Sequence, residues 1–269
     1  MPVRYATGLS SVGERLPDDS RRLDRPIPTA ARRGRLTVAA AGFWAFLGAS
    51  SLIIGALIGM SGRLTGRPLA LLIGFGSGAL ISAVAYDLIE EAVAVSATGV
   101  SVAVGFVAGA VVYFVGDELI ERMPGSGGLE ILLGAVLDGI PESIVLGLSL
   151  VGGAGPSVAV LVAIFISNVP EAASSSAKMQ AAGRPAHWVV GIWTLVAIAS
   201  AVAAAVGYGL FAGAPGDVIA FIDAFAAGAI LTLLASDLLP AAHEADKTKI
   251  VGLATAAGFA VAAALTLNG

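Results

Sequence analysis

The sequence contains no cysteine and only two histidines, and only 13% of its 269 residues are charged. The absence of cysteine excludes disulfide bridges and thiolate metal sites. Soluble domains are about one quarter charged, whereas this chain is 57% hydrophobic with a mean hydropathy of +0.90. A water-soluble fold could not bury so much apolar surface, so the composition predicts a membrane protein.

Long apolar segments fill most of the chain, and each is close to the roughly 20 residues that a transmembrane helix needs. A transmembrane barrel would instead show polarity that alternates over about ten residues, and the sequence has no such alternation. The sequence predicts an all-α, polytopic membrane protein with eight transmembrane helices, at 37–60, 68–89, 99–117, 129–151, 157–178, 186–212, 218–240 and 250–268. These helices form one transporter domain at 37–268, preceded by a polar, Arg-rich and disordered tail at 1–36.

Basic residues occur in every second loop between the predicted helices and are absent from the other loops. The positive-inside rule places Lys- and Arg-bearing loops in the cytoplasm. Both termini are therefore expected on the outer side of the membrane, which is expected to be the plasma (inner) membrane. The arginines next to the first helix, Arg32, Arg33 and Arg35, favour the opposite orientation, and we follow the loops because four of them agree. The basic loop residues are Arg63, Arg67, Arg122, Lys178, Arg184, Lys247 and Lys249.

Two pairs of segments repeat within the chain. GFGSGALISAVAYDLIEEA (74–92) resembles AFAAGAILTLLASDLLPAA (224–242) at a constant offset, which aligns Asp87 with Asp237. DGIPES (138–143) and SNVPEA (167–172) likewise align their Pro-Glu pairs. The predicted topology gives both pairs opposite directions, and inverted repeats with interrupted helices are typical of secondary transporters. Similar composition alone is the alternative explanation, and it applies more to the first pair.

Four acidic residues are expected at membrane depth: Asp138, Glu142, Glu171 and Asp237. Each costs about 2.5–3.5 kcal/mol on insertion scales. All basic residues are expected in the tail or the loops, so no lysine or arginine can neutralise these acids. The acids are therefore either protonated and hydrogen-bonded in kinked helices, or neutralised by a mobile cation.

Oxygen atoms converge around the two Pro-Glu pairs. Pro141 and Pro170 cannot donate to the carbonyl four residues earlier, so each leaves a carbonyl oxygen at membrane depth. Asp138 lies on the same helical face as Glu142, and Asn168 lies on the same face as Glu171. Ser167 and Ser175 extend the second face, and Asp237 is a further supporting residue. Two antiparallel helices of this kind would together supply about six oxygen donors, which suits a divalent cation.

These segments resemble the ZIP (Zrt/Irt-like) family of metal-ion transporters. The resemblance rests on DGIPESIVLG and SNVPEAASSSA in the fourth and fifth predicted helices, and on GSGALISAVAYDLIEE and AAGAILTLLASDLLPAAHE in the second and seventh. It covers residues 37–268. It implies an inverted-repeat (3+2+3) bundle, transport of divalent transition metals toward the cytoplasm by alternating access, and a homodimer.

The family's motif in the fourth helix usually reads His-Asn-x-Pro-Glu-Gly, and this chain departs from it. Asp138 stands in place of the His and Gly139 in place of the Asn, whereas Glu142 matches; in the fifth helix Asn168 stands at a polar position and Glu171 matches. A site without histidine shifts the expected preference from zinc toward Mn²⁺, Fe²⁺, Co²⁺ or Mg²⁺, although carboxylates also bind zinc. Gly139 offers no ligand for a second metal, so a single metal site is expected.

The leading hypothesis is a membrane transporter whose transported substrate is a divalent ion of Zn, Fe, Mn or Co. The protein is expected to contact membrane lipid, and neither a cofactor nor a nucleic-acid partner is expected. The metal ligands are expected to be Asp138, Glu142, Asn168 and Glu171. An intramembrane enzyme is not expected, because the sequence has no His-Glu-x-x-His run and no nucleophile elbow. The alternative is a proton- or sodium-linked secondary transporter of another solute, in which the carboxylates relay protons.

Overall fold

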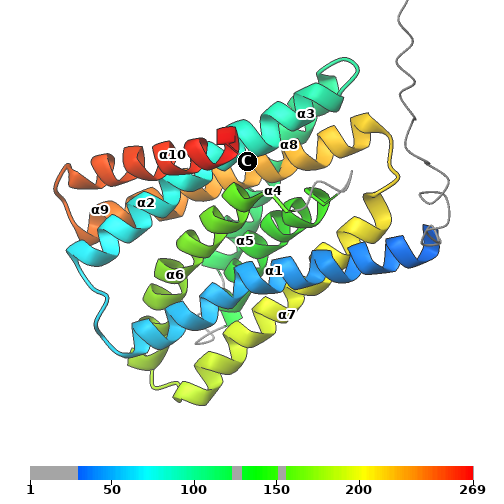
Figure 1. Cartoon of the computed structure of the whole chain (residues 1–269). Coiled ribbons are helices and arrows are strands. Elements are labelled where there is room, and N and C mark those ends of the chain that lie inside the picture. Colours follow the sequence, from blue (N-terminus) through cyan, green and yellow to red (C-terminus); the bar gives the residue numbers. More distant parts are fainter. Residues whose placement is uncertain (1–29, 123–128, 151–155, 269) are drawn as a thin grey trace, which may run out of the picture.

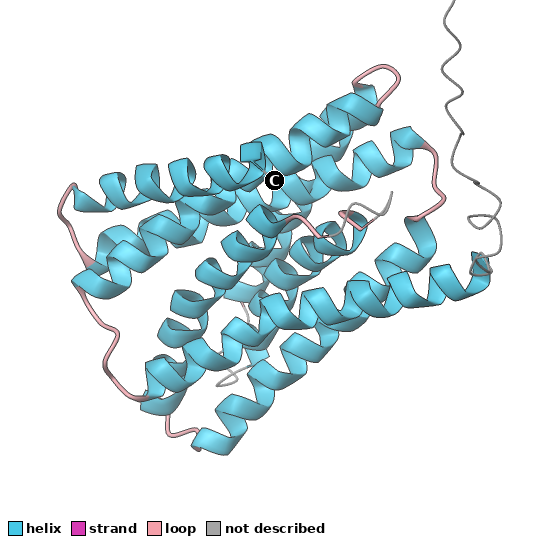
Figure 2. Cartoon of the chain, in the orientation of Figure 1, coloured by secondary structure: helices cyan, strands magenta, loops and turns pink. Residues whose placement is uncertain are grey.

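The computed structural model describes residues 30–122, 129–150 and 156–268, and all the regular elements in these ranges are helices (Figures 1 and 2). The predicted all-α fold is confirmed. The elements are α1 (Ala30–Met60), α2 (Arg67–Ala83), the π-helical turn η2 (Val84–Ile89), α3 (Glu90–Val95), α4 (Val100–Glu121), α5 (Leu129–Leu148), α6 (Val158–Ala181), α7 (Ala186–Phe211), α8 (Gly216–Leu233), the π-helical turn η3 (Leu234–Leu238), α9 (Leu239–Ala245) and α10 (Ile250–Asn268).

Seven helical segments in the described residues are long and apolar enough to cross a membrane. The chain is therefore a multi-pass membrane protein, as predicted. Helix α5 has 20 residues, but its described apolar stretch is only Gly139–Leu148. Helix α1 begins at Ala30, within the predicted tail, and the rest of that tail lies outside the described residues. The seven segments are Val38–Met60, Arg67–Val95, Val100–Ile120, Val158–Ala181, Ala186–Phe211, Gly216–Ala245 and Ile250–Leu267.

The helices pack in pairs that are distant in sequence. Helix α1 lies along α6 and α7, and α5 lies along α7; α2 lies along α10, and α4 lies along α8. Contacts of α2 with α6 and of α5 with α8 join these groups. Helices α2 and α8, which carry the first sequence repeat, run in opposite directions (Figure 1).

Glycines bring the backbones of two of these pairs into direct contact. A Cβ on Gly78 of α2 would overlap the carbonyl oxygen of Thr255 in α10, and a Cβ on Gly109 of α4 would overlap that of Phe225 in α8. Small residues are enriched at such interfaces because lipid-embedded helices associate through close van der Waals packing. These glycines are therefore required by the closeness of the helices.

Glycines also join the helices that carry the Pro-Glu pairs to their neighbours. Gly59 of α1 lies against the backbone of Ala173 in α6, so that a Cβ there would overlap the carbonyl oxygen. Gly147 of α5 lies against Ala204 in α7, where a Cβ would be 2.7 Å from the carbonyl oxygen. The resulting backbone contacts couple α6 to α1 and α5 to α7.

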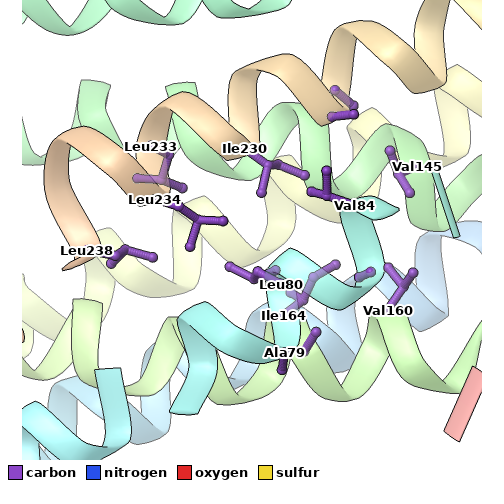
Figure 3. Close-up of a cluster of buried hydrophobic side chains, with 14 of the residues drawn as sticks. Ala79, Leu80, Val84, Val145, Val160, Ile164, Ile230, Leu233, Leu234 and Leu238 are labelled. Carbon is purple, nitrogen blue, oxygen red and sulfur yellow. The ribbon is translucent and has the colours of Figure 1, made fainter. Parts of the chain in front are cut away.

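The buried apolar core lies between the spans that carry the repeats and the two Pro-Glu helices. Figure 3 shows that its side chains come from α2 and η2, from α5 and α6, and from α8 and η3. Leu80, Leu146 and Leu234 are almost completely buried. This core surrounds the middle of α5 and α6, where polar residues also occur. Its labelled members are Ala79, Leu80, Val84, Val145, Val160, Ile164, Ile230, Leu233, Leu234 and Leu238.

Each of the two repeat-bearing spans is interrupted by a π-helical turn with an aspartate in it. Asp87 in η2 accepts hydrogen bonds from Ser157 Oγ at 2.7 Å and Thr266 Oγ1 at 3.2 Å. Asp237 in η3 accepts one from Tyr113 OH at 2.9 Å. Single π-helical turns within α-helices frequently occur at functional sites. Because the two turns occupy the same position in the repeats, both aspartates are candidate functional residues.

Trp193 of α7 is completely buried, and its Nε1 donates to Ser176 Oγ of α6 at 2.7 Å. Trp193→Phe keeps a large ring but removes this donor inside a dry interface, which we expect to cost about 1–3 kcal/mol. The melting temperature in detergent should fall by several degrees. Trp188→Phe, on the same helix but only partly buried, is the matched control. An equal loss in both variants would contradict the role of the hydrogen bond.

Candidate metal site between two proline-containing helices

Helices α5 and α6 both continue through an internal proline, Pro141 and Pro170 respectively. Because proline has no N–H, the carbonyls of Leu137 and Ile166 lose their helical hydrogen bond at these positions. In both helices the next residue is a glutamate. Each helix therefore brings a carboxylate and a weakened stretch of backbone into the interior of a membrane protein.

The two glutamates meet in one small pocket. This pocket has a volume of about 20 Å³, lies between α1, α5, α6 and α7, and is lined by Glu142, Asn168 and Glu171. Glu142 is only 5% exposed and Asn168 only 6%. A space of this size holds about one water molecule, so it also suits a single dehydrated ion. The other lining residues are Ala45, Ala49, Leu52, Gly139, Ser143, Leu146, Ile164 and Ser200.

The polar atoms of the pocket side chains are oxygens, apart from the amide nitrogen of Asn168. Its two carboxylates could balance the charge of one divalent cation, and hydroxyls of Ser143 and Ser200 add neutral oxygens. Such oxygen ligands favour hard ions such as Mg²⁺ and Mn²⁺. Within the part of the chain that the structure describes, no three His, Cys, Asp or Glu side chains are grouped so as to hold a metal. The described ligand set is therefore two carboxylates supplemented by neutral oxygens.

Glu171 also lines a second, larger pocket of about 400 Å³, which we call the vestibule. The vestibule lies between the C-terminal half of α6 and the segment η3–α9. Glu171 therefore lies between the two spaces and lines both of them. The vestibule is lined by Ile73, Pro170, Glu171, Ser174, Ser175, Lys178, Ser236, Asp237, Leu238, Pro240, Ala241 and Glu244.

An ion pair lies near the same end of the bundle. Arg67, the first residue of α2, has its Nε 3.7 Å from Asp246, which follows α9. The backbone N–H of Thr248 donates to Asp246 at 2.8 Å, and mainly for this reason the pKa of the Asp246 carboxyl lies below its usual value. Asp246 therefore stays charged at neutral pH and fixes the loop after α9.

The predicted site residues have different outcomes. The structure brings Glu142, Asn168 and Glu171 together in the small pocket, and places Ser175 and Asp237 in the vestibule with Glu171. Ser167 is buried but lines neither space, and its hydroxyl donates to the Ile164 carbonyl at 3.0 Å within α6. Asp138 belongs to α5, but its side chain lies outside the described residues.

Some polar residues of these spaces were not predicted. Ser143 directly follows Glu142, and its sequence position could have identified it; Ser200 comes from α7, and nothing in its own helix pointed to it. Lys178 was predicted in a loop, away from the acids. Helix α6 instead extends to Ala181, and Lys178 lines the vestibule with Glu171.

Two further acids were not predicted as site residues. Asp87, near the end of the second predicted helix, is partly buried and accepts two hydrogen bonds. Asp223 of α8 is only 4% exposed and was not considered. Its position within the apolar segment predicted at 218–240 is the signal that could have identified it.

Comparison of the chain with models of known protein families finds no match, and comparison with curated proteins finds none either.

Proposed function

We propose that this protein is a membrane transporter for divalent metal ions of the Zn, Fe, Mn and Co class. The observation that carries the proposal is the convergence of Glu142, Asn168 and Glu171, from two proline-containing helices, on one pocket of single-ion size. Burying carboxylates within a membrane protein is costly unless they are paired or protonated. A transported cation offsets that cost while it is bound, and the vestibule supplies a path for it to leave.

In this proposal α5 is an eighth transmembrane helix and the bundle is a 3+2+3 inverted repeat of the ZIP type. The opposite directions of α2 and α8 support it. So do the matching π-helical turns, since Asp87 and Asp237 are separated by the same offset as the sequence repeats. The glycine contacts repeat in the same way: a Cβ on Gly258 would overlap the carbonyl oxygen of Phe75, just as one on Gly109 would overlap that of Phe225.

The direction of transport in this proposal is toward the cytoplasm, with both termini outside the plasma (inner) membrane. The vestibule is lined by Lys178 and Glu244, which are close in sequence to the loops that contain Arg184, Lys247 and Lys249. The positive-inside rule assigns these loops to the cytoplasm. In alternating access the vestibule would close on the cytoplasmic side, and a path to the small pocket would open on the outer side of the membrane. The exposed apolar face of α4, with Val104, is available to lipid and to the second copy of a homodimer.

Metal binding to the purified protein tests the proposal. Saturation with MnCl₂, ZnCl₂ or CoCl₂ at about 100 times the dissociation constant should stabilise the protein by about 2.7 kcal/mol and raise its melting temperature. Binding should weaken as the pH falls into the range in which carboxylates become protonated, because protons compete with the metal for carboxylate oxygens. MgCl₂ and CaCl₂ at the same concentration report selectivity. Absence of any stabilisation by all the divalent ions would refute the proposal.

One observation favours the alternative of a proton- or sodium-linked transporter of another solute. The described residues do not contain three His, Cys, Asp or Glu side chains in one group that could hold a metal, and two carboxylates with neutral oxygens also suit Na⁺ or protons. The same thermal titration decides between the two. Stabilisation by NaCl in excess of that by choline chloride, without any response to divalent ions, would select the alternative.

A further inference from the structure

Lys178 is the basic residue of the vestibule, which it shares with three acids. The vestibule is lined by the carboxylates of Glu171, Asp237 and Glu244 together with Lys178. Asp237 is already held by Tyr113 OH at 2.9 Å. Lys178 is exposed and has no ion-pair partner among the described residues. Its ammonium group is therefore a mobile positive charge within an acidic space.

Lys178 lies on the same face of α6 as Glu171, one of the two glutamates of the small pocket. Lys178 follows Glu171 by seven residues, which is about two helical turns, so both side chains lie on one face of α6. Ser174 and Ser175 lie between them and line the same vestibule. Lysine carries its charge on a flexible four-carbon stem, so the ammonium can move toward Glu171 or away from it. An ion that leaves Glu171 through the vestibule would therefore move within a space that this charge also lines.

We propose that Lys178 is a tethered cation that competes with the metal ion for the vestibule carboxylates and thereby promotes release of the ion. This inference rests on the proposed function. A divalent ion next to Glu171 is repelled by the ammonium, which weakens its binding on the vestibule side. Once the ion has left, the ammonium compensates the carboxylates that the ion has vacated. Lys178 is thus a positioning residue that acts through electrostatics and does not itself bind the metal.

The test compares Lys178→Gln with Lys178→Arg and with Lys249→Gln. Lys249 is an exposed loop lysine that does not line the vestibule, so its substitution makes the same charge change elsewhere. Mn²⁺ affinity is measured by calorimetry, and Mn²⁺ uptake is measured in proteoliposomes. Lys178→Gln should bind Mn²⁺ about tenfold more tightly and should turn over at least threefold more slowly, because release becomes slower. Lys178→Arg should retain wild-type values, and Lys249→Gln should stay within twofold of them.

The ionic-strength dependence separates an electrostatic role from a structural one. In 0.5 M NaCl the difference between Lys178→Gln and wild type should shrink, since salt screens an exposed charge. Unchanged or weaker Mn²⁺ binding by Lys178→Gln would overturn the inference, as would equal tightening by Lys249→Gln, while leaving the proposed function intact. Failure of the wild-type protein to bind Mn²⁺ would overturn the proposed function and the inference together.

Discussion

Replacing both Glu142 and Glu171 with alanine is expected to abolish divalent-metal transport. The double variant leaves only Asn168 and hydroxyl groups in the small pocket, and these cannot balance two positive charges. Each hydrogen-bonded charged ligand contributes about 1.5–3 kcal/mol, so the affinity should fall on the order of 10²- to 10⁴-fold. The measurement is uptake of Zn²⁺, Mn²⁺, Fe²⁺ and Co²⁺ into proteoliposomes that contain a metal-sensitive dye.

Three controls separate loss of ligands from loss of fold. Glu90→Ala combined with Glu91→Ala removes two exposed acids that line neither space, and it should transport at close to the wild-type rate. Glu142→Gln preserves the shape of the side chain and removes only its charge, so it should resemble Glu142→Ala. The melting temperature of the alanine double variant, measured without metal, shows whether its fold is retained. Wild-type uptake of all four metals by the double variant would show that the site is misassigned.

Gly78→Ala is expected to destabilise the bundle strongly, although it adds a single methyl group. The new Cβ would overlap the carbonyl oxygen of Thr255, and backbone cannot move aside as a flexible side chain can. Helices α2 and α10 would have to separate along their contact. We expect a cost of about 3 kcal/mol, the upper part of the usual range for overpacking, and a melting temperature lower by roughly 6–12 °C.

Gly252→Ala is the matched control, because it lies in α10 and a Cβ there meets nothing within 4 Å. Alanine is also the better helix former, so this variant should be as stable as wild type or slightly more stable. Gly109→Ala should behave like Gly78→Ala, since its Cβ would overlap the Phe225 carbonyl oxygen. The measurement is thermal unfolding in detergent monitored by gel filtration. Similar melting temperatures for Gly78→Ala and Gly252→Ala would refute the close-contact explanation.

Seven of the eight segments predicted from hydropathy correspond to helices that are long and apolar enough to cross a membrane, because hydropathy depends only on residues that are close in the sequence. It misjudged the ends of two of them. The segments predicted at 68–89 and 218–240 extend in the structure over Arg67–Val95 and Gly216–Ala245. Glu90 and Glu91 follow directly after the predicted end of the first, and the helix continues through them with their side chains exposed. Pro240 stands at the predicted end of the second, but the helix continues through it from η3 into α9.

The sequence predicted those features of the candidate site that are determined within a single helix. The spacing of Asn168 and Glu171 places them on a common face, and the structure brings both to the pocket that contains Glu142. The choice of hydroxyl groups depends instead on how α5, α6 and α7 are rotated against one another. Ser167 was therefore expected at the site although it lines neither pocket, and Ser200 was not expected there although it lines the small pocket. Helical periodicity alone cannot supply that rotation.

The backbone contacts at Gly59 and Gly147 link the two Pro-Glu helices to their neighbours without any flexible side chain between them. The contact at Gly59 holds α6, with Glu171, against α1, and the contact at Gly147 holds α5, with Glu142, against α7. Helix α1 also packs along α7. A substitution that widened either glycine contact would therefore change the spacing of the two carboxylates, although it lies in neither pocket.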